Sequence, residues 1–260
     1  MPAVSDNHVS NAIPRKRRVM PVIIEEKCKG CRLCISYCPM DAFTVVRRKR
    51  VAIDQDRCTE CYVCLRKEVC PFGAIEKVEL DGSLRNFSHF LSDPTETKAT
   101  TGVPGRGTEE SKTNDVTGRT KIGQVGIAID MGRPGVGLKL VDAEKVAMAV
   151  AAAGLEFEEC SPLTEVMADK RTGKLRAEYL EVHLLSIIVE GNCRVEEFSR
   201  IIEALQEVEG KIDTVFSLGV ITRVDAEGSS PVMAEIERLG LKRPIRGKVN
   251  VGLGKPLRHD

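Results

Sequence analysis

Hydrophobic and polar positions follow a regular secondary-structure period only in the second half of this 260-residue chain. From residue 124 onward, apolar residues alternate with small or polar ones at Val125, Ile127, Ile129 and Met131. A period of two places these four side chains on one face of an extended segment. The pattern therefore predicts a β-strand at the start of a folded domain.

The same half predicts three further strands and three helices. Asp142 is expected to cap a helix that ends at Gly154, with Val146 and Val150 on its buried face. Further strands are expected from residue 157, over 181–190 and over 214–224, and further helices over 195–208 and 231–239. The order βαββαβ predicts a split-βαβ sheet with two helices on one face. Because such folds bind small molecules, sense ligands or form dimers, the fold does not select a function.

Residues 81–123 show little apolar periodicity and contain several glycines and prolines, which predicts a long connecting loop. Loops of this length are uncommon in compact domains unless they are functional or disordered. Residues 102–119 mix glycines with charged and hydrogen-bonding side chains, so we expect an ordered functional loop. Arg106 and Arg119 would hold a carboxylate or phosphate there through bidentate contacts. A solvated linker is the alternative.

A glycine-rich turn formed by Gly132, Gly135 and Gly137 lies between a predicted strand and a predicted helix. Its backbone N–H groups could face the phosphate of a flavin, a nucleotide or coenzyme A. The spacing differs from the dinucleotide-binding order G-x-G-x-x-G, so an ordinary glycine turn is the alternative. Outside this turn, His183 is expected to pack in an apolar strand, and Cys160 and Cys193 are expected to be buried structural thiols.

Eight of the ten cysteines form two matching runs, Cys28-x2-Cys31-x2-Cys34-x3-Cys38-Pro39 and Cys58-x2-Cys61-x2-Cys64-x5-Cys70-Pro71. Three thiolates spaced two residues apart can bind three corners of a cubane, and the Cys-Pro of the opposite run supplies the fourth. We therefore assign cluster I to Cys28, Cys31, Cys34 and Cys70, and cluster II to Cys58, Cys61, Cys64 and Cys38. Thiolates also bind zinc, so a pair of zinc sites is the alternative.

Residues 21–80 resemble a bacterial-type ferredoxin domain with two [4Fe–4S] clusters, and the resemblance includes an internal repeat. In this repeat, Cys38-Pro39-Met40-Asp41-Ala42-Phe43 matches Cys70-Pro71-Phe72-Gly73-Ala74-Ile75. The resemblance implies two β-hairpins and two short helices related by a pseudo-twofold axis, and one-electron transfer between neighbouring clusters. This sequence departs from the family in having two extra residues between Cys64 and Cys70. The remainder of the chain resembles uncharacterised iron–sulfur proteins of anaerobes.

Charge and composition narrow the expected partners and location. The formal net charge is +1, which gives no reason to expect a nucleic-acid partner. No apolar run reaches the length needed to span a bilayer, and no secretory signal is recognised, so we expect a cytoplasmic protein. Residues 21–80 carry eleven Lys and Arg against nine Asp and Glu. The basic residues 47–50 are expected at a hairpin turn, where they would dock a partner, tune the clusters or simply be solvated.

We therefore expect an α+β chain in four parts: a flexible basic tail (1–20), a two-cluster ferredoxin module (21–80), a connecting loop (81–123) and a split-βαβ, ferredoxin-like α/β sandwich domain (124–260) that binds a partner or ligand. The predicted function is single-electron transfer to or from a larger oxidoreductase, without a catalytic residue set of its own. The alternative is an iron–sulfur oxidoreductase whose second domain binds substrate or flavin itself. A homo-oligomer is compatible with either function.

Overall fold

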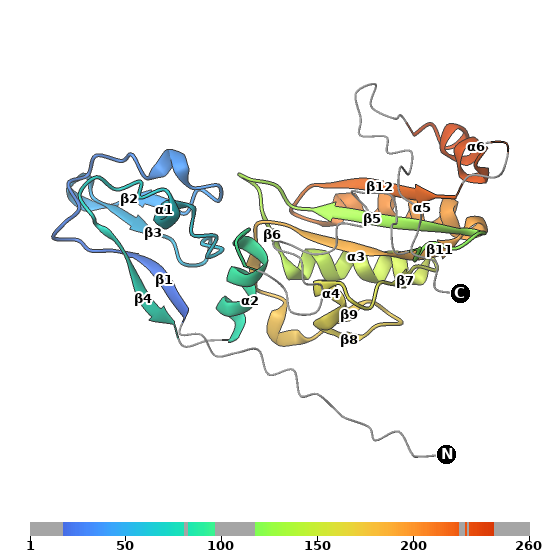
Figure 1. Ribbon diagram of the computed structural model, residues 1–260, viewed down its shortest axis with the longest axis horizontal. Coiled ribbons are helices and arrows are strands. Elements are labelled where there is room, and N and C mark those ends of the chain that lie inside the picture. The colour runs from blue at the N-terminus through green and yellow to red at the C-terminus, as the bar shows by residue number, and fades with distance from the viewer. Residues whose placement is uncertain (1–17, 81–82, 97–117, 224–226, 228, 242–260) are drawn as a thin grey trace, which may run out of the picture.

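The computed structural model describes residues 18–80, 83–96, 118–223, 227 and 229–241. Figure 1 shows a small unit built from the cysteine-rich region at one end and a larger sheet-and-helix unit at the other, with helix α2 between them. Of the expected basic tail, only residues 18–20 lie within the described ranges, and they form part of the first strand.

The cysteine-rich unit consists of two antiparallel strand pairs and short helical turns. Strand β1 (Arg18–Ile23) pairs with β4 (Ile75–Leu80), and β2 (Phe43–Val45) pairs with β3 (Val51–Ile53). The helical turns are η1 (Ile35–Tyr37), η2 (Arg47–Lys49) and α1 (Val63–Arg66). Its buried hydrophobic cluster, within the described residues, is small and consists of Cys34, Phe43, Val51 and Val69. A core this small contributes little stability, so bound metal must supply much of the rest.

Helix α2 (Ser83–Ser92) occupies part of the region that we predicted to be loop, so that prediction was wrong for these residues. Its apolar side chains recur at Leu84, Phe87 and Leu91, the spacing of one helix face. Leu91 is fully buried, and Leu84 and Phe87 pack against the larger hydrophobic core. The short apolar pattern was obscured by the glycines and prolines that follow it.

The larger unit is built on a four-stranded antiparallel sheet. The sheet contains β5 (Gln124–Met131), β7 (Glu156–Phe157), β11 (Ile187–Arg194) and β12 (Phe216–Thr222) in the order β12-β5-β11-β7. Helices α3 (Leu140–Ala152) and α5 (Phe198–Val208) contact each other. The chain therefore has mixed helix and strand content, as an α+β protein does (Figure 1).

The core of this unit lies on the face of the sheet to which the predicted alternation points. Val125, Ile127, Ile129 and Met131 on β5 are each at most 2% exposed. Five residues of α5 that recur at helical spacing are buried with them: Phe198, Ile201, Ile202, Leu205 and Val208. Each apolar side chain buried in this way contributes roughly 1.5–3 kcal/mol. The strand at 125–131 and the helix at 195–208 are therefore confirmed.

Several predicted boundaries differ from the structure. Helix α3 begins at Leu140, with Lys139 at its N-cap, so Asp142 lies in the first turn instead of capping it. The carboxylate of Asp142 there pairs with Lys145 and accepts from the N–H of Asp213. The expected strand over 181–190 is split into β10 (His183–Leu184), which pairs with β6 (Leu138–Lys139), and β11.

The remaining elements are short. They are α4 (Pro162–Glu165), β8 (Met167–Asp169), β9 (Lys174–Leu175), η4 (Ala177–Tyr179), η5 (Val195–Glu197), η6 (Glu209–Lys211) and α6 (Pro231–Arg238). The last of these confirms the helix expected over 231–239. Among the residues that the structure describes, no helix is both long and apolar enough to cross a membrane.

Candidate metal centre

Eight thiols of the cysteine-rich unit line two separate cavities. One cavity has about 320 Å³ of space not occupied by atoms, part of it open to solvent, and its lining includes Cys28, Cys31, Cys34 and Cys70. The other has about 360 Å³, and its lining includes Cys38, Cys58, Cys61 and Cys64. Each cavity thus gathers the four thiols that the sequence assigned to one cluster, with the fourth thiol coming from the opposite run.

The backbone of the two runs repeats the same conformation at equivalent positions. Residues with left-handed φ angles occur in matched pairs around the cysteines: Gly30 (68°) and Glu60 (54°), Arg32 (65°) and Tyr62 (55°), and Asp41 (50°) and Gly73 (60°). These angles bend the chain tightly and let successive N–H groups face one concavity. The N–H of Ala42 donates to Cys38 Sγ and that of Ala74 donates to Cys70 Sγ, both over 3.3 Å. Such bonds favour a charged sulfur.

The donor set fits a polynuclear iron–sulfur cluster better than a single ion. Within the described ranges, no three His, Cys, Asp or Glu side chains converge closely enough to hold one metal ion, although four thiols line each cavity. Burial raises the pKa of Cys34 to about 11 and those of Cys58 and Cys64 to about 12. Because metal ligands must be thiolates, a bound cationic cluster would have to offset this effect of burial.

The two cavities differ in what surrounds them. The first is bordered by exposed loop residues: Cys31, Lys29 and Arg32 are exposed, and Phe72 is 46% exposed. At the second, Thr59 and Met40 are 1% and 2% exposed. The second cavity therefore lies under other parts of the chain.

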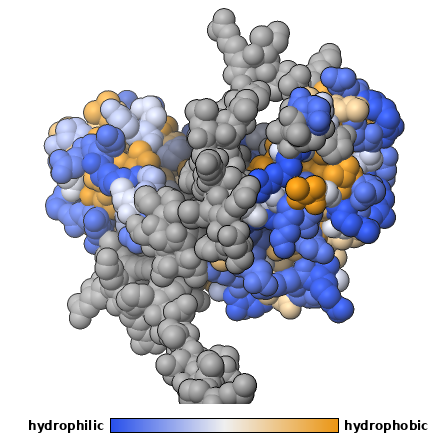
Figure 2. Space-filling model, turned by 45° about the vertical axis from the view of Figure 1, so that its right-hand side comes forward, coloured by the Kyte–Doolittle hydropathy of each residue, from blue (hydrophilic) through white to orange (hydrophobic). Residues whose placement is uncertain are grey.

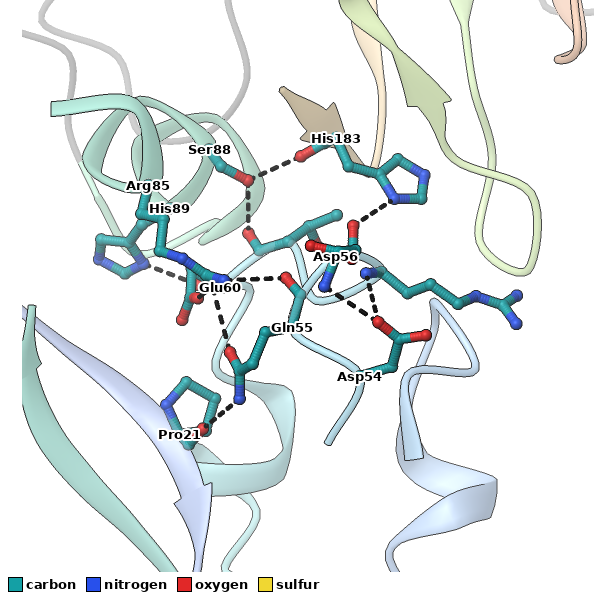
Figure 3. Close-up of polar contacts among 11 residues, drawn as sticks. Pro21, Asp54, Gln55, Asp56, Glu60, Arg85, Ser88, His89 and His183 are labelled. Atoms are coloured by element: carbon teal, nitrogen blue, oxygen red, sulfur yellow. Dashed lines mark hydrogen bonds and ion pairs between the residues drawn. The ribbon is translucent and has the colours of Figure 1, made fainter. Parts of the chain in front are cut away.

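Helix α2 covers the loop between Cys58 and Cys61 through polar contacts, which Figure 3 shows. The guanidinium of Arg85 binds the carboxylate of Glu60 over 2.6 Å and donates to the carbonyl of Gln55 over 3.0 Å. His89 Nδ1 lies 2.7 Å from the Glu60 carbonyl. Burial raises the pKa of Glu60 and Arg85 opposes that effect, so the pair holds a buried carboxylate beside the thiols.

The same helix joins this loop to the sheet unit. Ser88 Oγ lies 3.2 Å from the carbonyl of Thr59 and 2.8 Å from that of His183. The ring of His183 donates from Nδ1 to the carbonyl of Asp56 over 3.2 Å (Figure 3). Sequence reasoning did not identify any of the α2 contacts. The signal that could have found them is the apolar spacing of Leu84, Phe87 and Leu91.

The glycine turn also contacts the cysteine-rich unit. The N–H of Gly135 donates to the carbonyl of Pro39, and a Cβ on Gly137 would overlap the Met40 side chain. The N–H groups of Gly132 and Gly137 donate to the carbonyls of Val215 and Arg133, both over 2.8 Å. The turn therefore packs against the second cavity. Its role in binding a phosphate stays a prediction, and a phosphate would have to displace these carbonyls.

The predicted anion-binding arginines are not brought together by the structure. Arg106 lies outside the described residues, as does most of the loop over 102–119. Arg119 Nη1 lies 3.4 Å from a carboxylate oxygen of Glu158. Of the two remaining cysteines, Cys193 is buried in the core as expected, whereas Cys160 is exposed, so that expectation was wrong. The residue follows strand β7, where the chain runs along the surface.

Comparisons with known proteins agree with this geometry. Residues 27–74 match the model of the 4Fe-4S dicluster domain. The chain is 33% identical over 72 residues to pyruvate synthase subunit PorD of Methanocaldococcus jannaschii, covering 28% of this chain and 81% of that one. It is 44% identical over 52 residues to a ferredoxin of Methanothermococcus thermolithotrophicus, covering 19% of this chain and 83% of that one.

A third relative is a much longer protein. Over 83 residues the chain is 39% identical to 6-hydroxynicotinate reductase of Eubacterium barkeri, covering 32% of this chain and 16% of that one. No solved structure matches the chain. The resemblance to ferredoxins is thereby confirmed, together with two [4Fe–4S] clusters as cofactors. Through residues 27–74, the chain belongs to the 4Fe–4S dicluster ferredoxin family.

Proposed function

We propose that this protein passes single electrons through its two [4Fe–4S] clusters to or from a larger oxidoreductase. The observation that carries the proposal is the sorting of eight thiols into two cavities, each completed by a cysteine from the opposite run. The relatives support it, because one is a subunit of pyruvate synthase and another is a ferredoxin. An iron–sulfur cluster supplies reversible one-electron chemistry with little rearrangement.

Different residues of the module would bind the two clusters and shield them from water. One cluster would be held by Cys28, Cys31, Cys34 and Cys70, and the other by Cys58, Cys61, Cys64 and Cys38. The N–H groups of Ala42 and Ala74 reduce the negative charge on the crossing sulfurs Cys38 and Cys70. Apolar residues such as Ile23 and Phe43 in the cavity linings keep water away. Burial, hydrogen bonds to sulfur and local charge together set the reduction potential.

The sheet unit would position the module against its partner. We infer that residues 124–222 form a split-βαβ unit, since the strand order β12-β5-β11-β7 and the sequence of elements agree with that topology. The unit contacts the module directly at Pro39 and Asp56, and Ser88 of α2 bridges the carbonyls of Thr59 and His183. A sheet fixed in this way to one side of the module would fix which side a partner can approach.

Metal analysis of anaerobically purified protein tests the proposal. We expect about eight iron and eight acid-labile sulfide per chain, and reversible bleaching of the visible absorbance by dithionite. Zinc in place of iron, or about four irons, would contradict it. Flavin bound to the isolated chain would instead indicate an oxidoreductase with its own substrate site.

A further inference from the structure

The two cavities differ in the exposure of several loop residues at equivalent positions. Lys29 is exposed, whereas Thr59 at the matching position is buried. Phe72 follows Cys70-Pro71 and is 46% exposed, whereas Met40 follows Cys38-Pro39 and is 2% exposed. Since one-electron transfer between proteins requires close approach, the exposed rim of the cavity of Cys28, Cys31, Cys34 and Cys70 is the better contact site.

Three large hydrophobic side chains lie exposed in the first cysteine run or at its cavity. Leu33 and Tyr37 are each 51% exposed, and Phe72, which lines the cavity, is 46% exposed. Figure 2 shows hydrophobic side chains at the surface of the cysteine-rich unit, next to hydrophilic ones. Exposed aromatic and aliphatic groups gathered at one place mark a contact surface for another protein.

The charged side chains at the first cavity are positive. Among the described residues, Lys29 and Arg32 are the charged ones that line the first cavity, and none that is charged lines the second. Lys49 adjoins them, because a Cβ on Gly30 would lie 2.6 Å from the Lys49 carbonyl oxygen. Among the described residues, neither Lys29, Arg32 nor Lys49 forms an ion pair. The nearby acid Glu25 is paired with Arg50 over 3.1 Å.

Other segments of the chain cover part of the rim of the opposite cavity. The Glu60 loop lies under Arg85 and His89 of α2, and Met40 lies under the glycine turn that contains Gly137. A redox protein approaching from the side of α2 or of the glycine turn would have to displace these contacts.

We propose that Leu33, Tyr37 and Phe72, together with Lys29, Arg32 and Lys49, form a docking surface for an acidic redox protein, and that electrons enter or leave at this surface. Because it specifies the partner, this inference rests on the proposed electron-transfer function. In each exchange one electron moves between the cluster held by Cys28, Cys31, Cys34 and Cys70 and the partner's cofactor, and no bond of the docking residues changes.

Carbodiimide cross-linking tests the contact without measuring electron transfer. The probe is flavodoxin, a small flavoprotein with an acidic surface around its flavin. The reagent joins a lysine amine to a carboxylate as an amide and leaves as the urea. Mass spectrometry of the cluster-loaded protein should place cross-links at Lys29 and Lys49 and not at Lys170, an exposed lysine of the β8–β9 turn. Cross-links at Lys170 as often as at Lys29 would overturn the proposal.

Oxidation by small inorganic ions tests the charge separately. Hexacyanoferrate(III), a trianion, takes one electron from the dithionite-reduced protein and becomes hexacyanoferrate(II). At low ionic strength its rate should fall about tenfold in Lys29→Glu/Arg32→Glu, while the rate with the trication hexaammineruthenium(III) should rise. The control is Arg171→Glu, a 93% exposed arginine on the same turn as Lys170, and it should change neither rate.

The hydrophobic part of the docking surface is tested with flavodoxin. Phe72→Ser with Leu33→Ser should slow electron transfer to flavodoxin severalfold and leave the rate with hexacyanoferrate(III) unchanged, because only a protein buries these side chains. Iron and sulfide are measured first in every variant. Absence of clusters in the wild-type protein would contradict the proposed function, whereas full clusters with unchanged rates would overturn the docking surface alone.

Discussion

The two cysteine runs can be compared residue by residue, and they differ most outside their ligands. Gly30 and Glu60 occupy equivalent positions with φ angles of 68° and 54°, so the backbone follows the same path in both. Gly30 is half-buried between the exposed residues Lys29 and Cys31, whereas Glu60 is 0% exposed and bound to Arg85. Cysteine spacing therefore sets the local backbone geometry, while distant segments decide how much of each cavity's rim is exposed.

The largest expected effect comes from replacing Cys38 or Cys70, the two cysteines that line the cavity of the opposite run. Cys38→Ala should remove the cluster of the second run and leave the ligands of the first, so iron should fall from about eight to about four per chain. Cys70→Ala is the matched control and should remove the other cluster. Resolved EPR spectra of the two reduced variants identify which cluster remains. If Cys38→Ala retained the cluster of Cys58, Cys61 and Cys64, the crossed ligand sets would be wrong.

Removing Arg85 tests whether α2 protects only the second cavity. Arg85→Ala leaves the carboxylate of Glu60 buried without this cation, which should lower the free energy of unfolding by about 3 kcal/mol. Thermal unfolding of the cluster-loaded protein under anaerobic conditions measures the loss. Air should then bleach one cluster faster, and EPR should show that it is the one held by the second run.

A double variant separates the effect of the buried Glu60 charge from the effect of losing the Arg85 side chain. Glu60→Gln combined with Arg85→Ala removes the uncompensated carboxylate, so part of the lost stability should return. Equal loss in the single and double variants would mean that the ion pair does not hold the helix in place.

The glycine turn gives a third test, in which two similar glycines have different surroundings. Gly137 has a φ of 63°, and a Cβ there would overlap Met40 and lie 2.9 Å from His183 Nε2. Gly135 has a φ of 86°, but a Cβ there would meet nothing within 4 Å. Gly135→Ala should therefore cost only backbone strain, about 1 kcal/mol, and Gly137→Ala should cost about 1–3 kcal/mol more. Equal losses in thermal unfolding would mean that the turn does not brace the second cavity.

The sequence was sufficient to predict which thiols lie together, but not what surrounds them. Cysteine spacing repeats at short range, and a ligand loop of a few residues has few ways to present three thiols, so the sorting of thiols into two cavities could be predicted. The alternation at Val125–Met131 likewise fixed a core strand, because one face must be buried.

The contacts between the two units could not be read from the sequence. Arg85 and Glu60 are 25 residues apart, and Ser88 and His183 are 95 apart. No local pattern connects such pairs. The glycines at 132, 135 and 137 suggested a phosphate, but φ angles permitted by glycine also allow the close packing seen at Met40. Glycine spacing alone does not distinguish a turn that binds a ligand from a turn that packs against another segment of the same chain.

The smallest expected effect concerns the pH dependence of the contact at His183, which joins the sheet unit to the loop before Cys58. Burial lowers the pKa of His183 below the usual value of about 6.5, and the cations Lys139 and Arg57 lower it further. The Asp56 carbonyl and Asp54 oppose the shift. The folded protein therefore holds a neutral ring whose Nδ1–H donates to Asp56, and the unfolded chain binds a proton more readily.

Since the unfolded state binds more protons, the stability from this group should rise with pH across the window between the folded pKa and about 6.5. Below that window it should be lost. In anaerobic urea unfolding, the wild-type protein should therefore lose more stability between pH 7.5 and pH 5.5 than His183→Gln, which keeps a donor but does not titrate. Asn192→Gln, a substitution elsewhere in the sheet unit, should keep the wild-type pH slope. A slope for His183→Gln as steep as that of the wild type would assign the acid sensitivity to other groups and leave the contact at His183 without a titrating role.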